Sequence, residues 1–235
     1  MAVYWSIAHK GIIGALRVQT PELVLRNKPV SEVGYNVCPA FRDYFHNVYG
    51  WKSVHSHSLE KGVNQEGVEG YISNLHTQEF FDNNIFIRSL DEQLISIKQM
   101  SSFVTDSPSL KLSVEHPYFE DNEFTSSCYV IPGTMDIGKY YRRLDFAFRI
   151  KEDHGSVAFD EGTIVYYLRF HTSEKINLKQ YYMSDRLREY QDVVDEIKMF
   201  STFSPRPLSF FYDIYKKYNL KNKILKEIKE NLIDS

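Results

Sequence analysis

The chain has 235 residues, with 28 lysines and arginines against 31 aspartates and glutamates, and a formal net charge of −3. A general nucleic-acid binder needs a surplus of cations to displace counterions, so this balance argues against that class. Hydrophobic residues make up 43% and aromatic residues 15% of the chain, which excludes wholesale disorder and allows a large core.

The N-terminal sequence, the lack of long apolar stretches and the two cysteines indicate the cellular compartment in which the protein is expected. Residues 1–5 lack a cationic segment followed by an apolar run, so we expect no signal peptide. No stretch approaches 18 apolar residues, so we expect no membrane span. Cys38 and Cys128 are too few for a disulfide framework or a four-thiolate zinc site, and we expect both to be small buried side chains. We therefore expect the protein to be in the cytoplasm, or in an assembly that is built there.

Residues 1–180 predict a β-rich domain. Short apolar or alternating segments occur at 3–7, 12–18, 85–87, 94–97 and 110–114. The strongest signal is an alternating strand at 143–150, a turn, a short strand at 156–159, a second turn, and a segment at 163–170 that is apolar on both faces and therefore central. Many short strands predict a mainly β fold: a sandwich, a jelly roll, a partly open barrel or a β-clip-like body.

Residues 181–235 predict a C-terminal α-helical hairpin. Apolar residues recur every three or four positions from Leu187 to Phe200, after Ser184 as the expected N-cap. Prolines at 205 and 207 end this helix, and a second helical pattern runs from 208 to 232, with Asn219 as a candidate kink. The lysines of that second pattern are interrupted by acidic residues, which favours a solvated helix face. The hairpin is expected either to pack on the β domain or to project from it.

A histidine pair is the first candidate site. His55 and His57 would face one side of a strand, and two imidazoles with the carboxylate of Glu60 can hold a divalent metal. The segment is polar and the spacing to Glu60 is short. We therefore favour the alternative, a polar strand or loop with exposed histidines.

A turn rich in opposed charges is the second candidate site. Asp136, Lys139, Arg142 and Arg143 follow the Pro-Gly turn at 132–133. An arginine pair in this turn can hold the carboxylate or phosphate of a ligand. The alternative, which we favour, is a cluster of surface ion pairs where a turn enters a strand.

Catalytic motifs are weak. His154 and His171 each begin a His-x-Ser triplet, as in two-histidine phosphodiesterases, but they are only 17 positions apart and His154 lies in a predicted turn. The chain has no Gly-x-Ser-x-Gly, no phosphate-binding Gly-x-x-x-x-Gly-Lys and no dinucleotide-binding Gly-x-Gly-x-x-Gly. We therefore predict no catalytic residue and no cofactor. Whether the protein is an enzyme stays open, and a non-enzyme is favoured.

Three segments together resemble a family of uncharacterised proteins from large contractile-tailed phages, especially marine and cyanobacterial ones. The segments are 38–53 (Cys-Pro-Ala-Phe to Lys-Ser), 132–142 (Pro-Gly-Thr-Met-Asp to Arg) and 161–178 (Glu-Gly to Leu). The resemblance implies a phage protein that acts in the host cytoplasm or in the virion. At fold level, the order of turns and strands from 132 to 170 is similar to the trimeric dUTPase and dCTP deaminase β-fold. That likeness implies that Asp136 would lie beside a nucleotide sugar, although the uridine-binding and phosphate-binding motifs of those enzymes are absent from this chain.

Two functions follow as expectations. The first is a non-enzymatic assembly or interaction module, virion-associated or host-interacting, that binds a protein partner or itself. The second is an intracellular protein that binds or hydrolyses a small ligand or nucleotide, using the turn from Asp136 to Arg143.

Overall fold

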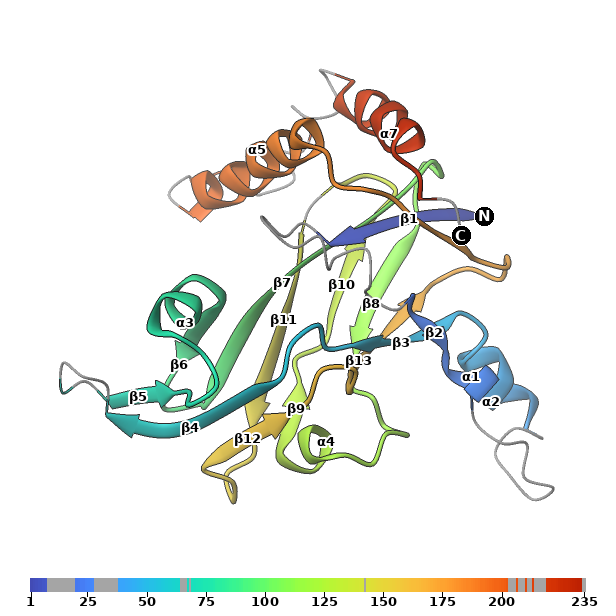
Figure 1. Cartoon of the computed structure of the whole chain (residues 1–235). Helices are drawn as coiled ribbons and strands as arrows, with labels where there is room; N and C mark the ends of the chain where they lie inside the picture. The colour runs from blue at the N-terminus through green and yellow to red at the C-terminus, as the bar shows by residue number, and fades with distance from the viewer. Residues whose placement is uncertain are drawn as a thin grey trace.

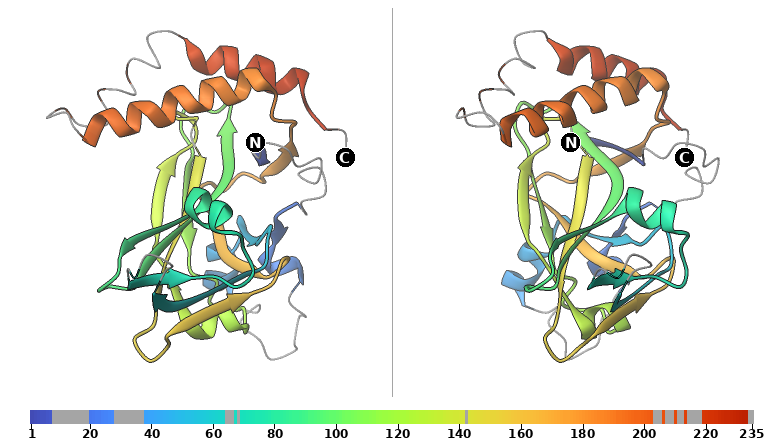
Figure 2. Two further views of the ribbon diagram at one scale, coloured as in Figure 1. Left: turned by 60° about the vertical axis from the view of Figure 1, so that its left-hand side comes forward. Right: turned by 90° about the vertical axis from the view of Figure 1, so that its left-hand side faces the viewer.

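The computed structural model describes residues 1–7, 20–27, 38–63, 67, 69–141, 143–202, 206, 210, 213 and 219–233 (Figure 1). Its body is mainly β, and two helices, α5 (Asp185–Thr202) and α7 (Leu220–Glu230), lie side by side over one end of the sheets (Figure 2). The predicted fold class, a β-rich body with a C-terminal helical hairpin, is confirmed. Among the residues described, no helix has the length and apolar character needed to cross a membrane.

Sheet A has six strands in the part of the chain that the structure describes. Its strand order is β14-β1-β7-β11-β9, and β6 pairs with the first part of the long strand β7. The strands are β1 (Ala2–Ile7), β6 (Ile85–Ser89), β7 (Leu94–Thr105), β9 (Cys128–Val130), β11 (Arg143–Ile150) and β14 (Asn177–Gln180). The β1–β14 pair is parallel and the other pairs are antiparallel. Residues 12–18 of the sequence-based prediction lie outside the described residues.

Two further sheets face sheet A. Sheet B has the order β10-β8-β13-β3-β2 and sheet C the order β12-β4-β5. Their strands are β2 (Glu22–Leu23), β3 (Val48–Lys52), β4 (His57–Val63), β5 (Glu69–Ile72), β8 (Lys111–Glu115), β10 (Gly133–Asp136), β12 (Ser156–Phe159) and β13 (Ile164–Phe170). β13 lies between β8 and β3 and is buried from Val165 to Leu168, so its predicted central place is confirmed.

One aromatic core joins the three sheets, as expected for a sandwich. Trp5 of sheet A meets Trp51 of sheet B edge-on, with ring centroids 5.8 Å apart, and Trp51 stacks on Tyr166 at 6.0 Å. Phe124 joins Phe159 of sheet C to the same core at 5.2 Å. The alternation predicted for β11 is confirmed, because Leu144, Phe146, Phe148 and Ile150 are all buried.

Four short helices were not predicted from the sequence: α1 (Val24–Asn27), α2 (Pro39–Tyr44), α3 (Gln78–Asn84) and α4 (Glu123–Ser127). Each is too short to show a helical periodicity. Their N-caps are the readable signals: the Thr77 side chain accepts a hydrogen bond from the Phe80 amide at 3.2 Å, and Asn122 forms a capping box with Thr125.

The C-terminal helices pack on the outer face of sheet A. Tyr4 and Val104 point to this face, opposite the core, and are buried against Leu187 of α5 together with Ile224 and Ile228 of α7. Each such aliphatic side chain contributes roughly 1.5–3 kcal/mol when fully buried. The two helices therefore pack on the β body and do not project from it, two arrangements between which the sequence did not decide.

Two of the positions predicted at the ends of these helices can be compared with the structure. The Ser184 hydroxyl accepts a hydrogen bond from the Leu187 amide at 3.3 Å, which confirms the predicted N-cap of α5. α7 begins at Leu220, directly after Asn219, whose φ of 53° is left-handed, so the helical pattern predicted from 208 to 232 is interrupted at the residue where a kink was expected. Of the residues from 208 to 218, only 210 and 213 are described.

Candidate functional site

A cleft of about 1030 Å³ lies between α7 and two turns of the β body. One turn joins β7 to β8 and the other joins β10 to β11. The lining residues are Asp106, Pro108, Gly138, Lys139, Tyr140, Asp213, Lys221, Asn222, Leu225, Lys226, Lys229 and Glu230. The cleft is thus bordered by four lysines and three acidic residues, with apolar surface between them.

Asp136 fixes the two turns to each other. Its Oδ1 accepts hydrogen bonds from the amides of Gly138 at 3.0 Å and Lys139 at 3.2 Å in its own turn, and from the Leu110 amide at 3.3 Å in the other. Its Oδ2 accepts one from the Ser109 hydroxyl at 2.8 Å. Partial burial acts to raise the pKa of the Asp136 carboxyl, but the hydrogen bonds from Ser109 and Lys139 outweigh it, and the pKa lies below its ordinary value. Asp136 therefore positions the wall of the cleft.

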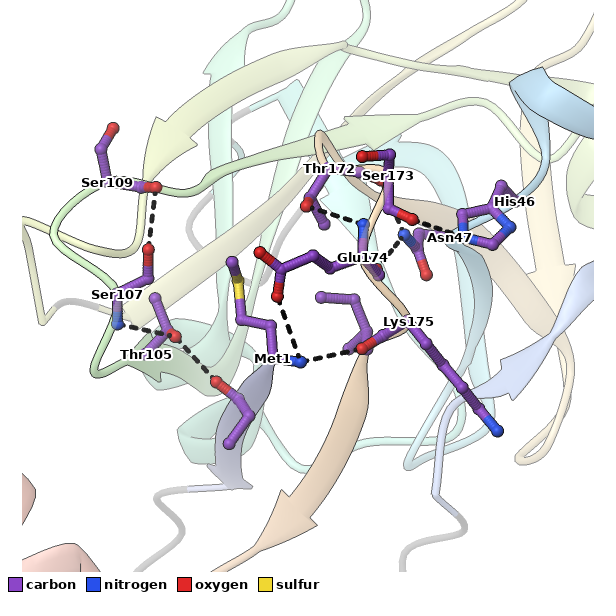
Figure 3. Close-up of polar contacts among 12 residues, drawn as sticks. Met1, His46, Asn47, Thr105, Ser107, Ser109, Thr172, Ser173, Glu174 and Lys175 are labelled. Carbon is purple, nitrogen blue, oxygen red and sulfur yellow. Dashed lines mark hydrogen bonds and ion pairs between the residues drawn. The ribbon is translucent and has the colours of Figure 1, made fainter.

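The turn between β7 and β8 is also held by its own hydroxyls (Figure 3). Thr105 Oγ1 donates to the Ala2 carbonyl at 2.7 Å and accepts from the Ser107 amide at 3.2 Å. Ser107 Oγ donates to the Ser109 carbonyl at 3.2 Å. These bonds tie this wall of the cleft to strand β1.

Lys221 joins α7 to both turns. Its ammonium group donates to the carbonyl oxygen of Ser107 at 2.7 Å and to that of Gly138. Burial lowers the pKa of Lys221, while Asp106 and Asp136 act in the opposite direction. Because its donors are directed at main-chain oxygens, Lys221 holds the back of the cleft.

The other three lysines remain available to a ligand. Their side chains are more than half exposed, and each forms an ion pair: Lys139 with Asp136 at 3.3 Å, Lys226 with Glu230 at 3.9 Å, and Lys229 with Asp106 at 4.0 Å. Exposed pairs of this kind are worth about 0–1 kcal/mol. An incoming anion can therefore compete for these ammonium groups at small cost.

The charged turn predicted from the sequence is divided between two places. Asp136 and Lys139 are at the cleft, but Arg143 Nη2 lies 2.9 Å from Asp192 Oδ1 and so joins β11 to α5. Arg142 lies outside the described residues. The lysines of α7 were expected on a solvated face, and the sequence carries no signal that they meet the turn at Lys139.

The histidine pair lies elsewhere, between sheet C and α3. His57 is buried, and its Nδ1 is 3.1 Å from Nε2 of His76, whose ring stacks on Phe80 at 4.2 Å. The His55 ring is 6.3 Å from the His57 ring. Burial, with the positive charge that His76 and His55 can carry, lowers the pKa of His57 to about 3. His57 is therefore neutral near pH 7.

The predicted metal ligands do not converge. Glu60 is exposed, whereas His57 and Leu59 of the same strand are buried, so Glu60 lies on the other face of β4. Within the described parts of the chain, no group of three or more His, Cys, Asp or Glu side chains is arranged to hold a metal ion. The partner of His57 is His76, and no sequence motif predicts that these two histidines meet.

Two further expectations concern histidines and cysteines. His154 lies in its turn, 3.8 Å from Asp153, whereas His171 Nε2 is 2.6 Å from the Ser113 hydroxyl, so the two His-x-Ser triplets have separate surroundings.

Cys128 is buried, and burial raises its pKa far above the ordinary value. The expectation of a buried Cys38 is wrong, because Cys38 precedes α2 at the surface and is exposed.

The chain matches no protein-family model, no curated protein and no solved structure.

Proposed function

We propose that the protein binds a small anionic ligand in the cleft beside α7. The observation that carries the proposal is the convergence of Lys139, Lys226 and Lys229, each with a side chain more than half exposed, from two separate elements of the fold. This is the second function expected from the sequence, with a changed role for Asp136, which positions the turn instead of contacting the ligand.

The lining favours a particular kind of anion. Lysine acts as a point charge toward phosphate or carboxylate groups. Leu225, Pro108 and the ring of Tyr140 offer apolar surface for the remainder of the ligand. Asp106 and Glu230 repel an extended polyanion such as nucleic acid. The best match is a compact molecule with one or two acidic groups and an apolar or aromatic part.

A thermal-shift screen of the full chain tests the proposal, with nucleoside phosphates, sugar phosphates and aromatic or aliphatic carboxylates as probes. Ligand at about 100 times its Kd adds about 2.7 kcal/mol to the free energy of unfolding. Lys226→Ala and Lys229→Ala should each weaken the binding of the best probe roughly 2- to 5-fold. Lys223→Ala is the matched control, because Lys223 is exposed on α7 but does not line the cleft.

Two results would overturn the proposal. One is a screen in which no anion raises the melting temperature. The other is a bound anion whose Kd is the same in Lys226→Ala, Lys229→Ala and the wild type.

A second candidate function is an assembly module of a phage particle, which would act in the virion or the host cytoplasm. It is favoured by the tyrosine surface, which we define as Tyr118, Tyr129 and Ile131, with 50%, 55% and 41% of their areas exposed. The His116 ring lies 6.1 Å from Tyr118 and 6.0 Å from Tyr129 and so joins the two tyrosines. Exposed tyrosines are typical of interface centres.

Light scattering of the purified chain and the protein composition of purified phage particles test the assembly module. The proposal expects either a defined oligomer or a fixed copy number in the particle. Tyr129→Ser should abolish this association, whereas Tyr182→Ser, which alters an exposed tyrosine outside this surface, should not. A monomer that is absent from particles would contradict it.

A further inference from the structure

A hydroxyl and an imidazole meet on the outer face of sheet B. Ser113 Oγ lies 2.6 Å from His171 Nε2 and 2.8 Å from Thr134 Oγ1. The neighbours of Ser113 on β8, Leu112 and Val114, belong to the core, so Ser113 points away from it. Thr134 is opposite Ser113 on β10, and His171 follows β13. Three strands of one sheet therefore hold this group in place.

The protonation of the group is set by its surroundings. Partial burial, and then the positive charges of Arg169 and Lys111, lower the pKa of His171, while Glu115 acts to raise it. The imidazole is therefore neutral at pH 7, and Nε2 can accept the proton of the Ser113 hydroxyl. The Thr134 hydroxyl can then donate to Ser113. This is the arrangement of a serine nucleophile beside its general base.

The ion pair between Arg169 and Glu115 flanks Ser113 and His171. Arg169 is the cross-strand neighbour of Ser113. Its guanidinium group is fixed 3.9 Å from the centre of the Tyr44 ring and 3.7 Å from Glu115. A cation held in place near a reacting hydroxyl stabilises negative charge that develops on the substrate. His171 and Thr134 are exposed, whereas only 6% of Ser113 is exposed, so a substrate reaches the hydroxyl from the side of His171 and Thr134.

We propose that Ser113 and His171 form an acyl-transfer site that acts on small carboxylic esters. Ser113 Oγ bonds to the carbonyl carbon as its proton passes to His171 Nε2. The ester C–O bond then breaks, and the departing alkoxide takes that proton and leaves as the alcohol. A water molecule, deprotonated by the same nitrogen, hydrolyses the acyl-serine, which releases the carboxylic acid and restores the Ser113 hydroxyl. This site is independent of the cleft beside α7.

A fluorophosphonate probe and p-nitrophenyl acetate, applied to the full chain, test the proposal. Peptide mapping by mass spectrometry should place a single label on Ser113. His171→Gln should slow labelling and ester hydrolysis about 100-fold, the scale of general-base catalysis. The matched controls are Ser126→Ala, an exposed serine that donates to the Glu123 carbonyl, and His154→Gln; both should react like the wild type. The labelling rate should be constant from pH 7 to 9 and fall in acid as His171 is protonated.

Ser113 is buried, so Ser113→Cys accompanies Ser113→Ala as a variant of similar size. The thiol should react with iodoacetamide faster in the presence of His171 than in Ser113→Cys/His171→Gln. The proposal is overturned if Ser113 takes no label, if His171→Gln hydrolyses the ester at the wild-type rate, or if the thiol reacts equally fast with and without His171.

Discussion

The ammonium group of Lys221 on α7 lies 2.7 Å from the carbonyl oxygen of Ser107, in the turn before β8. This contact and the one to Gly138 attach the last helix to the same two turns that Asp136 holds together. Both walls of the cleft therefore depend on a few partly buried polar contacts, and the cleft is part of the folded body.

Lys221→Met should remove this attachment while keeping most of the aliphatic stem. Hydrogen bonds to charged groups contribute about 1.5–3 kcal/mol each, and partial exposure reduces this, so we expect a loss of about 1–3 kcal/mol in the free energy of unfolding. Urea unfolding monitored by circular dichroism measures it. Lys223→Met, on the exposed side of the same helix, should change the value by less than about 0.5 kcal/mol. Equal effects of the two substitutions would mean that Lys221 is no attachment point.

Gly138→Ala tests how closely the two turns approach. A Cβ at Gly138 would lie 2.6 Å from the Cα of Ser109, a distance that requires the turns to separate. We expect a loss of about 1–3 kcal/mol, the scale of overpacking in a well-packed core, and weaker binding of any ligand that raises the melting temperature. Gly133→Ala is the control, because a Cβ at Gly133 would meet no described atom within 4 Å, and it should leave stability nearly unchanged.

The sequence predicted local features well and distant ones poorly. Alternation from Arg143 to Ile150 and the N-cap at Ser184 depend on neighbouring residues, and both are confirmed. The cleft needs residues near 106, 139 and 226 to meet, and no periodicity encodes a contact over such separations. The same holds for Ser113 and His171, which are brought together by the pairing of β8 with β13. The failure at Cys38 shows that apolar neighbours in sequence do not ensure burial.

The His57–His76 pair predicts a loss of stability in acid. The pKa of His57 is about 3 in the folded chain, against 6.5 for an unperturbed histidine. Between these values the unfolded chain binds a proton that the folded chain does not, so stability falls as the pH drops below 6.5 and this contribution levels off near pH 3. From pH 7 to pH 5 the expected loss is about 2 kcal/mol.

His57→Phe should remove that part of the pH dependence, whatever its effect on stability at pH 7. Urea unfolding at pH 7 and at pH 5, on wild type and variant, gives the difference directly. His154→Gln, a change at a partly exposed turn, should keep the wild-type difference. A difference of the same size in His57→Phe and wild type would refute the assignment to His57.

The side chain of Asn47 holds the segment that follows β13 (Figure 3), and its removal should lower the free energy of unfolding. Its side-chain amide donates to the carbonyl oxygens of Thr172 at 2.8 Å and Glu174 at 2.9 Å, and only 4% of the residue is exposed. The segment that it holds also receives the N-terminal amine, which donates to the Lys175 carbonyl at 3.0 Å. Asn47→Ala therefore leaves two carbonyl oxygens without their donor, and we expect a loss of about 2–3 kcal/mol.

The neighbouring residue supplies the control for Asn47. His46 Nε2 lies 3.1 Å from the carbonyl oxygen of Ser173 in the same segment, but that contact is exposed to water. Water can replace an exposed hydrogen bond, so His46→Ala should cost less than about 0.5–1 kcal/mol. Chemical denaturation of both variants measures the two values under one condition. If His46→Ala proved as costly as Asn47→Ala, the buried amide would not be what holds this segment beside the start of β3.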